Sequence, residues 1–234
     1  MANEKRQSLP PRHELKYYMN PAEIVALRSR LIGAMRRDKH TGPEGWYAIR
    51  SLYFDDAYDS AWDEKLAGVM HRDKYRIRIY NYSDSVIFME RKRKIGDLIA
   101  KSSVRITRRL AEQIISGDPT GLNMAQNPLI QDVYVMMRTR VLRPKVIVDY
   151  RREAFVHPAE DTRVTFDTHI CAAGGMNDIF DPSVPTVPAL PDGREVLEVK
   201  YDNYLPTHIA GLLSDISCER SAVSKYILCR RYSM

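Results

Sequence analysis

The sequence predicts an α+β domain in which an eight-stranded antiparallel β-barrel carries helices packed on its outside. Eight segments alternate polar and apolar side chains, which is the pattern of strands with two different faces. Helical segments lie between several of them, and the chain of 234 residues, 44% of them hydrophobic, is long enough for one large core. Because eight antiparallel strands can close on themselves, we expect a barrel. We expect a flexible leader over residues 1–11 and a single domain over 12–234.

The strands follow from alternation between turn signals. Alternating side chains predict strands over residues 12–18, 46–54, 72–80, 88–94, 101–105, 145–152, 163–168 and 194–201. Breaks rich in glycine and proline bound several of them, such as Gly42-Pro43-Glu44-Gly45 before the second strand. Residues 174–193 contain four prolines, which predicts a loop. Residues 224–229 are expected to form a final strand or an extended tail.

The helices follow from capping residues and from apolar side chains at helical spacing. They are expected over residues 21–37, 56–66, 107–115, 128–139 and 206–215. Asn20, Pro21 and Glu23 supply an N-cap residue, proline at the first helical position and an acidic residue at the third, which predicts where the first helix begins. Thr107 caps the third helix, and Gly117 ends it.

Charges fall on alternate residues in three consecutive strands between residues 72 and 105. Side chains two apart on a strand share a face. One face therefore gathers Lys74, Arg76, Arg78, Tyr80, Glu90, Lys92, Lys94, Lys101, Ser103 and Arg105. A solvated sheet face usually mixes both signs, whereas Glu90 is the single carboxylate here. Because such a cluster repels itself unless an anion compensates it, we interpret this face as the lining of a polar tunnel that holds phosphate charges.

Composition favours an anionic partner and excludes several classes of protein. Lys and Arg outnumber Asp and Glu by 36 to 30. Cys171, Cys218 and Cys229 are an odd number without metal-site spacing, so neither a disulfide framework nor a zinc site is indicated. No run approaches the ~18 apolar residues that span a membrane, and the N-terminus lacks the apolar core of a secretory signal. We therefore expect a cytoplasmic protein without a membrane segment.

Two further classes are disfavoured. The sequence has no glycine-rich G-x-x-x-x-G-K-[ST] loop, which counts against a P-loop nucleotidase. The basic strands also lack a regular interleaving of exposed aromatic side chains for base stacking, so nucleic acid is not expected as a partner.

Several segments, in this order, resemble one known family. They are R-H-E-L-K-Y, S-L-Y-F-D-D, R-D-K-Y-R-I-R-I-Y, E-R-K-R-K, V-D-Y-R-R-E-A-F, L-E-V-K-Y and the terminal S-K-Y. Together they resemble the catalytic domain of the vacuolar transporter chaperone (VTC) polyphosphate polymerases. That family belongs to the triphosphate tunnel metalloenzymes, with CYTH-type triphosphatases and adenylate cyclases. The resemblance implies an eight-stranded tunnel that binds a triphosphate through basic side chains and a divalent metal through carboxylate.

The resemblance, together with the cationic face, assigns roles to individual residues. We expect catalytic roles for Lys16, Arg76, Arg78, Lys92, Lys101 and Arg152. We expect substrate-binding roles for Lys74, Arg105, Tyr150, Arg163, Lys200, Ser224 and Lys225. Glu198 resembles the metal carboxylate for Mn²⁺ or Mg²⁺, and Glu14, Glu90 and Asp167 are further candidates. The alternative role of Glu198 is to pair with Lys200 on the same strand face.

One departure from the wider CYTH pattern bears on the metal. That group opens with E-x-E-x-K, whereas Arg12 stands here where the first Glu would be. Only Glu14 and Lys16 remain of the motif. The missing carboxylate favours a VTC-like tunnel over a two-metal hydrolase.

Three functions remain open from the sequence. The leading hypothesis is a metal-dependent polyphosphate polymerase, in which the end of a polyphosphate chain attacks the γ-phosphoryl of ATP. A tunnel triphosphatase that hydrolyses inorganic or nucleoside triphosphate would use the same basic lining. A non-catalytic module that binds polyphosphate or another polyanion is the third. Expected partners are ATP or triphosphate and polyphosphate, and the oligomeric state stays open.

Overall fold

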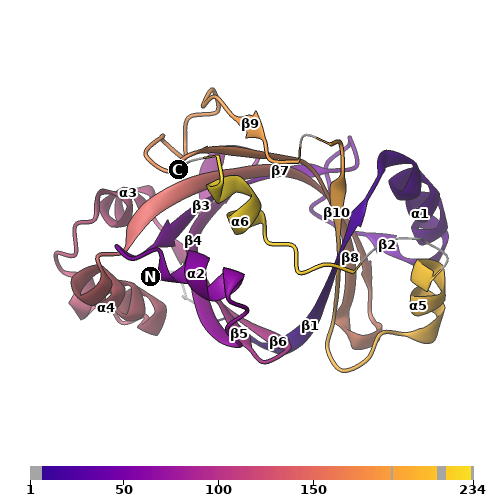
Figure 1. The fold of residues 1–234 in the computed structure, drawn as a ribbon, viewed down its shortest axis with the longest axis horizontal. Coiled ribbons are helices and arrows are strands. Elements are labelled where there is room, and N and C mark those ends of the chain that lie inside the picture. The colour runs from indigo at the N-terminus through magenta and orange to yellow at the C-terminus, as the bar shows by residue number, and fades with distance from the viewer. Residues whose placement is uncertain (1–6, 191, 215–219, 233–234) are drawn as a thin grey trace.

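The computed structural model describes residues 7–190, 192–214 and 220–232, with side chains from residue 10 onward. Within these residues, eight strands form a closed antiparallel barrel, which confirms the expected fold class (Figure 1). Around the barrel they are β7 (Arg143–His157), β3 (Tyr47–Asp55), β4 (His71–Tyr80), β5 (Ser83–Ile95), β6 (Leu98–Ile106), β1 (Gln7–Met19), β10 (Glu195–Tyr201) and β8 (Thr162–Gly174). The pairing of β7 with β8 closes the ring. Two short strands, β2 (Arg36–Arg37) and β9 (Val187–Pro188), pair with β7 and β8.

On two sides of the barrel, apolar strand faces point outward and are covered by helices. Figure 1 shows α3 (Arg108–Ser116) and α4 (Pro128–Arg140) at one side of the barrel, and α1 (Pro21–Ala34) and α5 (Thr207–Ser214) at the other. Ile77 and Met89 are fully buried in the same cluster as Val133 of α4. Each such side chain contributes about 1.5–3 kcal/mol on burial, so the helices stabilise the barrel from outside. None of the described helices is long and apolar enough to cross a membrane.

The first two helices differ from expectation at one end each. At α1, the Asn20 side chain accepts from Glu23 N at 3.0 Å and the Glu23 side chain accepts from Asn20 N at 2.7 Å, so the expected capping box is present. The helix ends at Ala34 rather than at 37, because Arg36 and Arg37 pair with β7 instead. The second helix, α2 (Ser60–Leu66), begins four residues late, because the side chain of Asp56 caps the preceding turn by accepting from Ser60 N.

The strand boundaries also extend past several expected ends. The first strand begins at Gln7, inside the segment expected to be a leader, and residues 1–6 lie outside the described part.

Single 3₁₀ turns occupy Leu122–Met124 and Ala159–Asp161. Cys171 and Cys229 carry free thiols, while Cys218 lies outside the described residues, as does residue 215 at the expected end of the last long helix.

The expectation for residues 224–229 was wrong, because this segment forms the helix α6 (Lys225–Arg230). Ser224 caps it by accepting from Ile227 N. Tyr226 and Ile227 are buried in one cluster with Ile49 of β3 and Val148 of β7, whose side chains share the inward face. Figure 1 shows α6 across part of the barrel opening. A six-residue helix has little intrinsic stability, so tertiary packing decides its conformation.

A buried ion pair anchors the segment before β9 to the barrel. Arg50 of β3, 1% exposed, donates to both carboxylate oxygens of Asp149 on β7, at 2.8 and 2.7 Å. The same guanidinium donates to the carbonyl oxygens of Ile179 and Asp181. Apart from β9 and Gly174, which ends β8, the described residues of the expected loop 174–193 are irregular, and residue 191 lies outside the described part. The loop is attached through a charged group on the outside of the barrel.

Arg50→Met should destabilise the protein by about 3–5 kcal/mol, because Asp149 would remain buried without its counter-charge. Urea unfolding measures the loss. The matched double variant Arg50→Met with Asp149→Leu should recover most of it, since no buried charge is left unpaired. A double variant as unstable as the single one would contradict this explanation.

Candidate active site in the barrel

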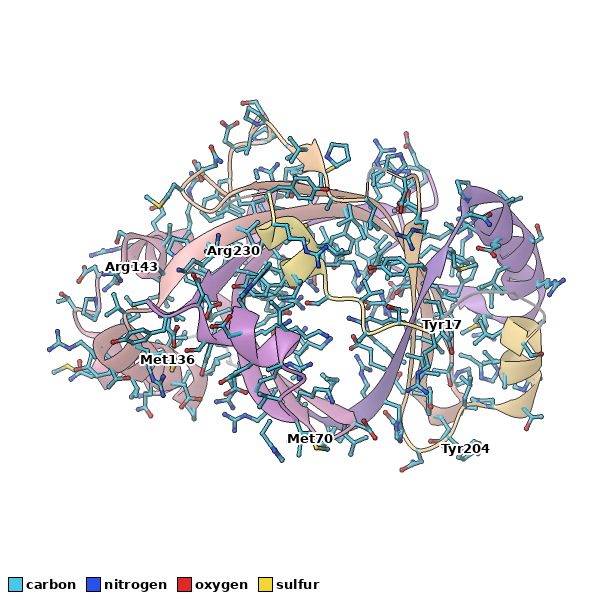
Figure 2. All side chains as sticks on the ribbon, in the orientation of Figure 1. Tyr17, Met70, Met136, Arg143, Tyr204 and Arg230 are labelled. Carbon is cyan, nitrogen blue, oxygen red and sulfur yellow. The ribbon has the colours of Figure 1, made fainter. Side chains whose placement is uncertain are left out.

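The interior of the barrel contains two adjoining cavities, into which side chains from the surrounding strands converge (Figure 2). The first, about 710 Å³, is bordered by Lys65, Arg72, Lys74 and Lys94, and we call it the lysine-rich end. The second, about 740 Å³, is bordered by Tyr47, Tyr80 and Phe88, and we call it the aromatic end. Both cavities are lined by Glu14, Arg76, Arg78, Lys92, Ile99, Arg152 and Lys200. These shared residues make the two cavities the ends of one tunnel.

An arginine layer crosses this shared middle. Arg76 Nε donates to Glu90 Oε2 at 2.7 Å, and its Nη1 donates to the Tyr53 hydroxyl at 2.7 Å. Arg78 Nη2 donates to the Tyr150 hydroxyl at 3.0 Å. Burial opposes the ionisation of Glu90, but the nearby Arg76 and Arg78 outweigh it and hold the pKa of this carboxyl well below its ordinary value. The guanidinium groups are thereby fixed as rigid donors at the tunnel wall.

A second cluster joins β7, β8, β10 and α6. Arg152 donates to both carboxylate oxygens of Asp167 at 2.6 Å. Lys225 Nζ lies 2.5 Å from Asp167 Oδ2 and 2.8 Å from Glu198 Oε1, and Lys200 Nζ donates to Glu198 Oε2 at 2.6 Å. Burial opposes the charge on Glu198, yet Lys200 and Lys225 keep its pKa well below the ordinary value. Every cation of this cluster is therefore positioned by a buried carboxylate.

Glu14 and Glu198 face a common cation. Lys16 Nζ lies 3.0 Å from Glu14 Oε1 and 3.5 Å from Glu198 Oε1. Lys92 Nζ donates to both oxygens of Glu14 at 2.7 Å. Across the described residues, no group of three or more Asp, Glu, His or Cys side chains has the arrangement of a metal site. The protein therefore offers two carboxylates to one cation.

Several buried lysines of the tunnel are less basic than usual, and burial lowers the pKa of Lys200 to about 7 although it pairs with Glu198. Lys74 Nζ donates to Ser224 Oγ at 2.8 Å, and in the described part of the chain no carboxylate reaches it. Burial, then the neighbouring Lys16 and Lys92, hold the pKa of Lys74 well below its ordinary value. Burial likewise lowers the pKa of Lys101 to about 8, although it contacts Glu90. A phosphate bound beside any of these amines would favour its ammonium form.

Most of the expected site residues meet in this tunnel. Its lining contains Glu14, Lys16, Lys74, Arg76, Arg78, Lys92, Lys101, Tyr150, Arg152, Arg163, Glu198, Lys200, Ser224 and Lys225. Glu90 is 1% exposed and contacts the arginine layer. Arg163 borders the aromatic end, where it pairs with Asp38 at 2.5 Å. Arg105 is exposed near the end of β6, where it donates to Ser85 O at 2.7 Å, and it does not line the tunnel.

The three basic strands expected to share a cationic face meet carboxylates from other strands of the barrel. Glu14, Asp167 and Glu198 enter from β1, β8 and β10, which the three basic strands alone could not reveal. The sequence reasoning also missed Tyr53. Alternation along β3 could have placed Tyr53 on the inner face, but a tyrosine in a strand carries no functional signal by itself.

A third cavity lies outside the tunnel. It measures about 560 Å³ and lies between α2, α4 and the strands β4 and β5. Asp55, Asp56 and Asp73 line it together with Arg93 and Arg140. Because both signs of charge are balanced there, it lacks the cationic excess of the tunnel.

Comparisons with known proteins agree with this geometry. The sequence matches the VTC domain over residues 11–234. The chain belongs to the VTC domain family. Among solved structures, a proposed adenylyl cyclase from Hippeastrum, described as having a dominant triphosphatase activity, is similar at a TM-score of 0.59. The two share 15% identity over 95% of this chain and 97% of that chain.

A second structure supports the same fold. A proposed adenylate cyclase from Bacillus halodurans is similar at a TM-score of 0.50 and 12% identity, with 87% of this chain and 86% of that chain covered. At such identities the likeness concerns the fold alone. No curated protein matches the chain significantly. The chain is thus a VTC domain, and its barrel shares the fold of these two proteins.

Arg76→Ala should weaken triphosphate binding and also destabilise the VTC domain, because the buried Glu90 loses its closest guanidinium. The double variant Arg76→Ala with Glu90→Gln should regain most of the stability of the ligand-free protein. Its triphosphate-induced rise in Tm should still be much smaller than that of the wild type. Thermal unfolding with and without inorganic triphosphate measures both effects, and an unchanged rise in Tm would exclude Arg76 from the binding site.

Triphosphate binding should take up protons above about pH 7. Phosphate favours the ammonium form, whereas Lys200 with its pKa of about 7 and Lys101 with its pKa of about 8 become increasingly neutral in the free protein as the pH rises past these values. Affinity should therefore fall as the pH rises from about 7 towards 10.5. Calorimetry in two buffers of different ionisation enthalpy measures the uptake. Lys101→Arg, which stays charged, should reduce it; proton release instead would contradict the argument.

Proposed function

We propose that the tunnel of this VTC domain is the active site of a metal-dependent polyphosphate polymerase that transfers the γ-phosphoryl of ATP to a growing chain. The observation that carries the proposal is the pair of cavities that adjoin across one cationic middle. A polymerase must hold two phosphate-bearing partners end to end, whereas a hydrolase needs one partner and water. A tunnel with two ends and shared cations suits the first requirement.

The chemistry asks for positioning rather than for a protein nucleophile. An oxygen of the terminal phosphate of the chain attacks the γ-phosphorus of ATP, and the bond from that phosphorus to the β,γ-bridging oxygen breaks. ADP leaves with the bonding electrons, and the chain gains one phosphate. Because the attacking oxygen is already ionised near neutral pH, no general base is required.

The residues of the shared middle would neutralise the charge that develops. Arg76, Arg78 and Arg152 present planar guanidinium groups, each held by a hydrogen bond, that can bind two phosphate oxygens at once. Lys92 and Lys200 add compact charges nearby. Preorganised cations stabilise a transition state without reorganising during the reaction, which is the main catalytic contribution available here.

The divalent metal that the family implies fits the donor set of this tunnel. Glu14 and Glu198 already flank one cation, the ammonium of Lys16, and carboxylate oxygens suit Mg²⁺ and Mn²⁺. With two carboxylates, phosphate oxygens and water would complete the coordination shell. Such an ion would offset charge on the bridging phosphate oxygens.

A tunnel triphosphatase is the second candidate function. The Hippeastrum protein, which shares the fold, is described as having a dominant triphosphatase activity. The same arginine layer would hold a triphosphate, and water would take the place of the polyphosphate chain end as the attacking group. We place either activity in the cytoplasm, where ATP is abundant and the free thiols of Cys171 and Cys229 stay reduced.

Incubation of the purified protein with ATP and Mn²⁺, followed by separation of the products, distinguishes the candidates. Polyphosphate with ADP supports the polymerase. Orthophosphate with ADP and no polyphosphate supports the triphosphatase. If ADP does not form while triphosphate still raises the Tm, the tunnel is a polyanion-binding module and the polymerase proposal fails.

Glu198→Gln should lower turnover by roughly two orders of magnitude, because it removes a charge that would hold the metal and position Lys225. Triphosphate should still bind, and more tightly in metal-free buffer, since one negative charge has left the tunnel. The control is Glu195→Gln on the same strand, where the carboxylate instead accepts from His169 N outside the tunnel. Near-normal, metal-dependent turnover of Glu198→Gln would make Glu198 a structural partner of Lys200.

A further inference from the structure

Aromatic side chains occupy the inner wall at one end of an otherwise charged tunnel. Tyr80 lies two residues beyond Arg78 on β4, and Phe88 lies opposite Arg78 on the neighbouring β5. Both line the aromatic end and are only partly buried. Tyr47 of the adjacent β3 lies beside Tyr80. Three neighbouring strands thus place rings next to the arginine layer.

The rings at this end do not cover one another's faces. Tyr80 and Phe88 meet edge to face, with centroids 6.4 Å apart and planes at 86°. Tyr47 and Tyr80 are tilted by 51° at 6.1 Å. Neither contact stacks two faces together, and an edge-to-face contact occupies one face of only one ring of the pair. Val86, Ile99 and Val156 add apolar surface around them.

The opposite end is built differently. There, Tyr201 stacks on His13 with centroids 5.0 Å apart, and Tyr53 stacks on Tyr226 at 5.4 Å. In both pairs the two rings lie face to face against each other. The remaining border is cationic, with Lys65, Arg72, Lys74 and Lys94. An extended polyanion suits that end. At the aromatic end Arg12, Lys101 and Arg163 are each paired with a carboxylate, so the rings there suit a flat, uncharged group.

The spacing matches a nucleotide. Two residues along a strand span about 7 Å, so the backbone positions of Tyr80 and Arg78 are about as far apart as a base and the first phosphate that its ribose carries. The aromatic end is also continuous with the phosphate site, because Arg76, Arg78 and Arg152 line both cavities. A ligand with phosphates on the arginines would therefore present its base to the rings.

We propose that the aromatic end binds the nucleobase of a nucleoside triphosphate, with Tyr80 and Phe88 as its stacking platform. The triphosphate then points towards the lysine-rich end, where the acceptor chain enters. The inference builds on the proposed function, since it assigns a direction to the substrate in the same tunnel. Stacking tolerates every base. The side-chain oxygen of Asn81, which lies at this end, already accepts a hydrogen bond from Ala48 N and so is not free to distinguish one base from another. The platform should therefore select nucleotides over inorganic triphosphate more strongly than one purine over another.

The test compares two ligands on matched variants. Phe88→Leu and Tyr80→Leu keep an apolar side chain but remove the ring. Calorimetry with ATP and with inorganic triphosphate gives the ratio of the two affinities for each protein. We expect ATP to bind about fivefold or more weakly to either variant. The affinity for inorganic triphosphate should stay within about twofold, which also shows that the variant is folded with an intact tunnel.

Tyr201→Leu, which removes a ring from the opposite end, is the control and should leave the ratio unchanged. An unchanged ratio in both Phe88→Leu and Tyr80→Leu overturns the inference, as does an equal loss for the two ligands or a changed ratio in Tyr201→Leu. If one of the two variants fails to fold, the other decides. The measurement detects binding and no product. If the protein stacks ATP but forms no polyphosphate, this inference stands and the proposed polymerase activity fails.

Discussion

The balance of charge inside the barrel is the constraint on which the rest of this structure depends. Buried cations in an apolar barrel would repel one another, so carboxylates stand between them: Glu90 among the arginines, and Glu198 among lysines. Desolvation makes each buried ion costly, and only good geometry compensates for it. The carboxylates nevertheless remain fewer than the cations. In the proposed function a bound polyanion would complete the balance, which would couple stability and ligand binding in the same side chains.

This polar interior forces the apolar core to the outside. Strand faces with Ile77 and Met89 would be exposed if the barrel stood alone, and α3 and α4 cover them. On the other side, α1 covers Phe166 and Leu197. The helices are thus a requirement of the tunnel, because a barrel can be charged within only if another layer buries its outer face.

The end of the chain completes the tunnel. Lys16 Nζ donates to Val223 O at 3.1 Å, and Tyr226 donates its hydroxyl proton to Asp55 Oδ2 at 2.6 Å. These contacts hold α6 against the inner wall and bring Lys225 to Asp167 and Glu198. Residues from the two ends of the sequence therefore form one cluster, and the site depends on a helix that folds only in the context of the barrel.

The sequence by itself determined the strands, the capping box of α1 and the cationic face of β4 to β6. These features are local: alternation reports which residues share a face, and Arg76 and Arg78 share one wherever the strand lies. Only the tertiary structure decided which cation each carboxylate pairs with, that Arg105 does not line the tunnel, and that residues 225–230 form a helix. Each depends on contacts between segments far apart in the chain, such as Arg152 with Asp167 across β7 and β8, and local pattern carries no information about such pairing.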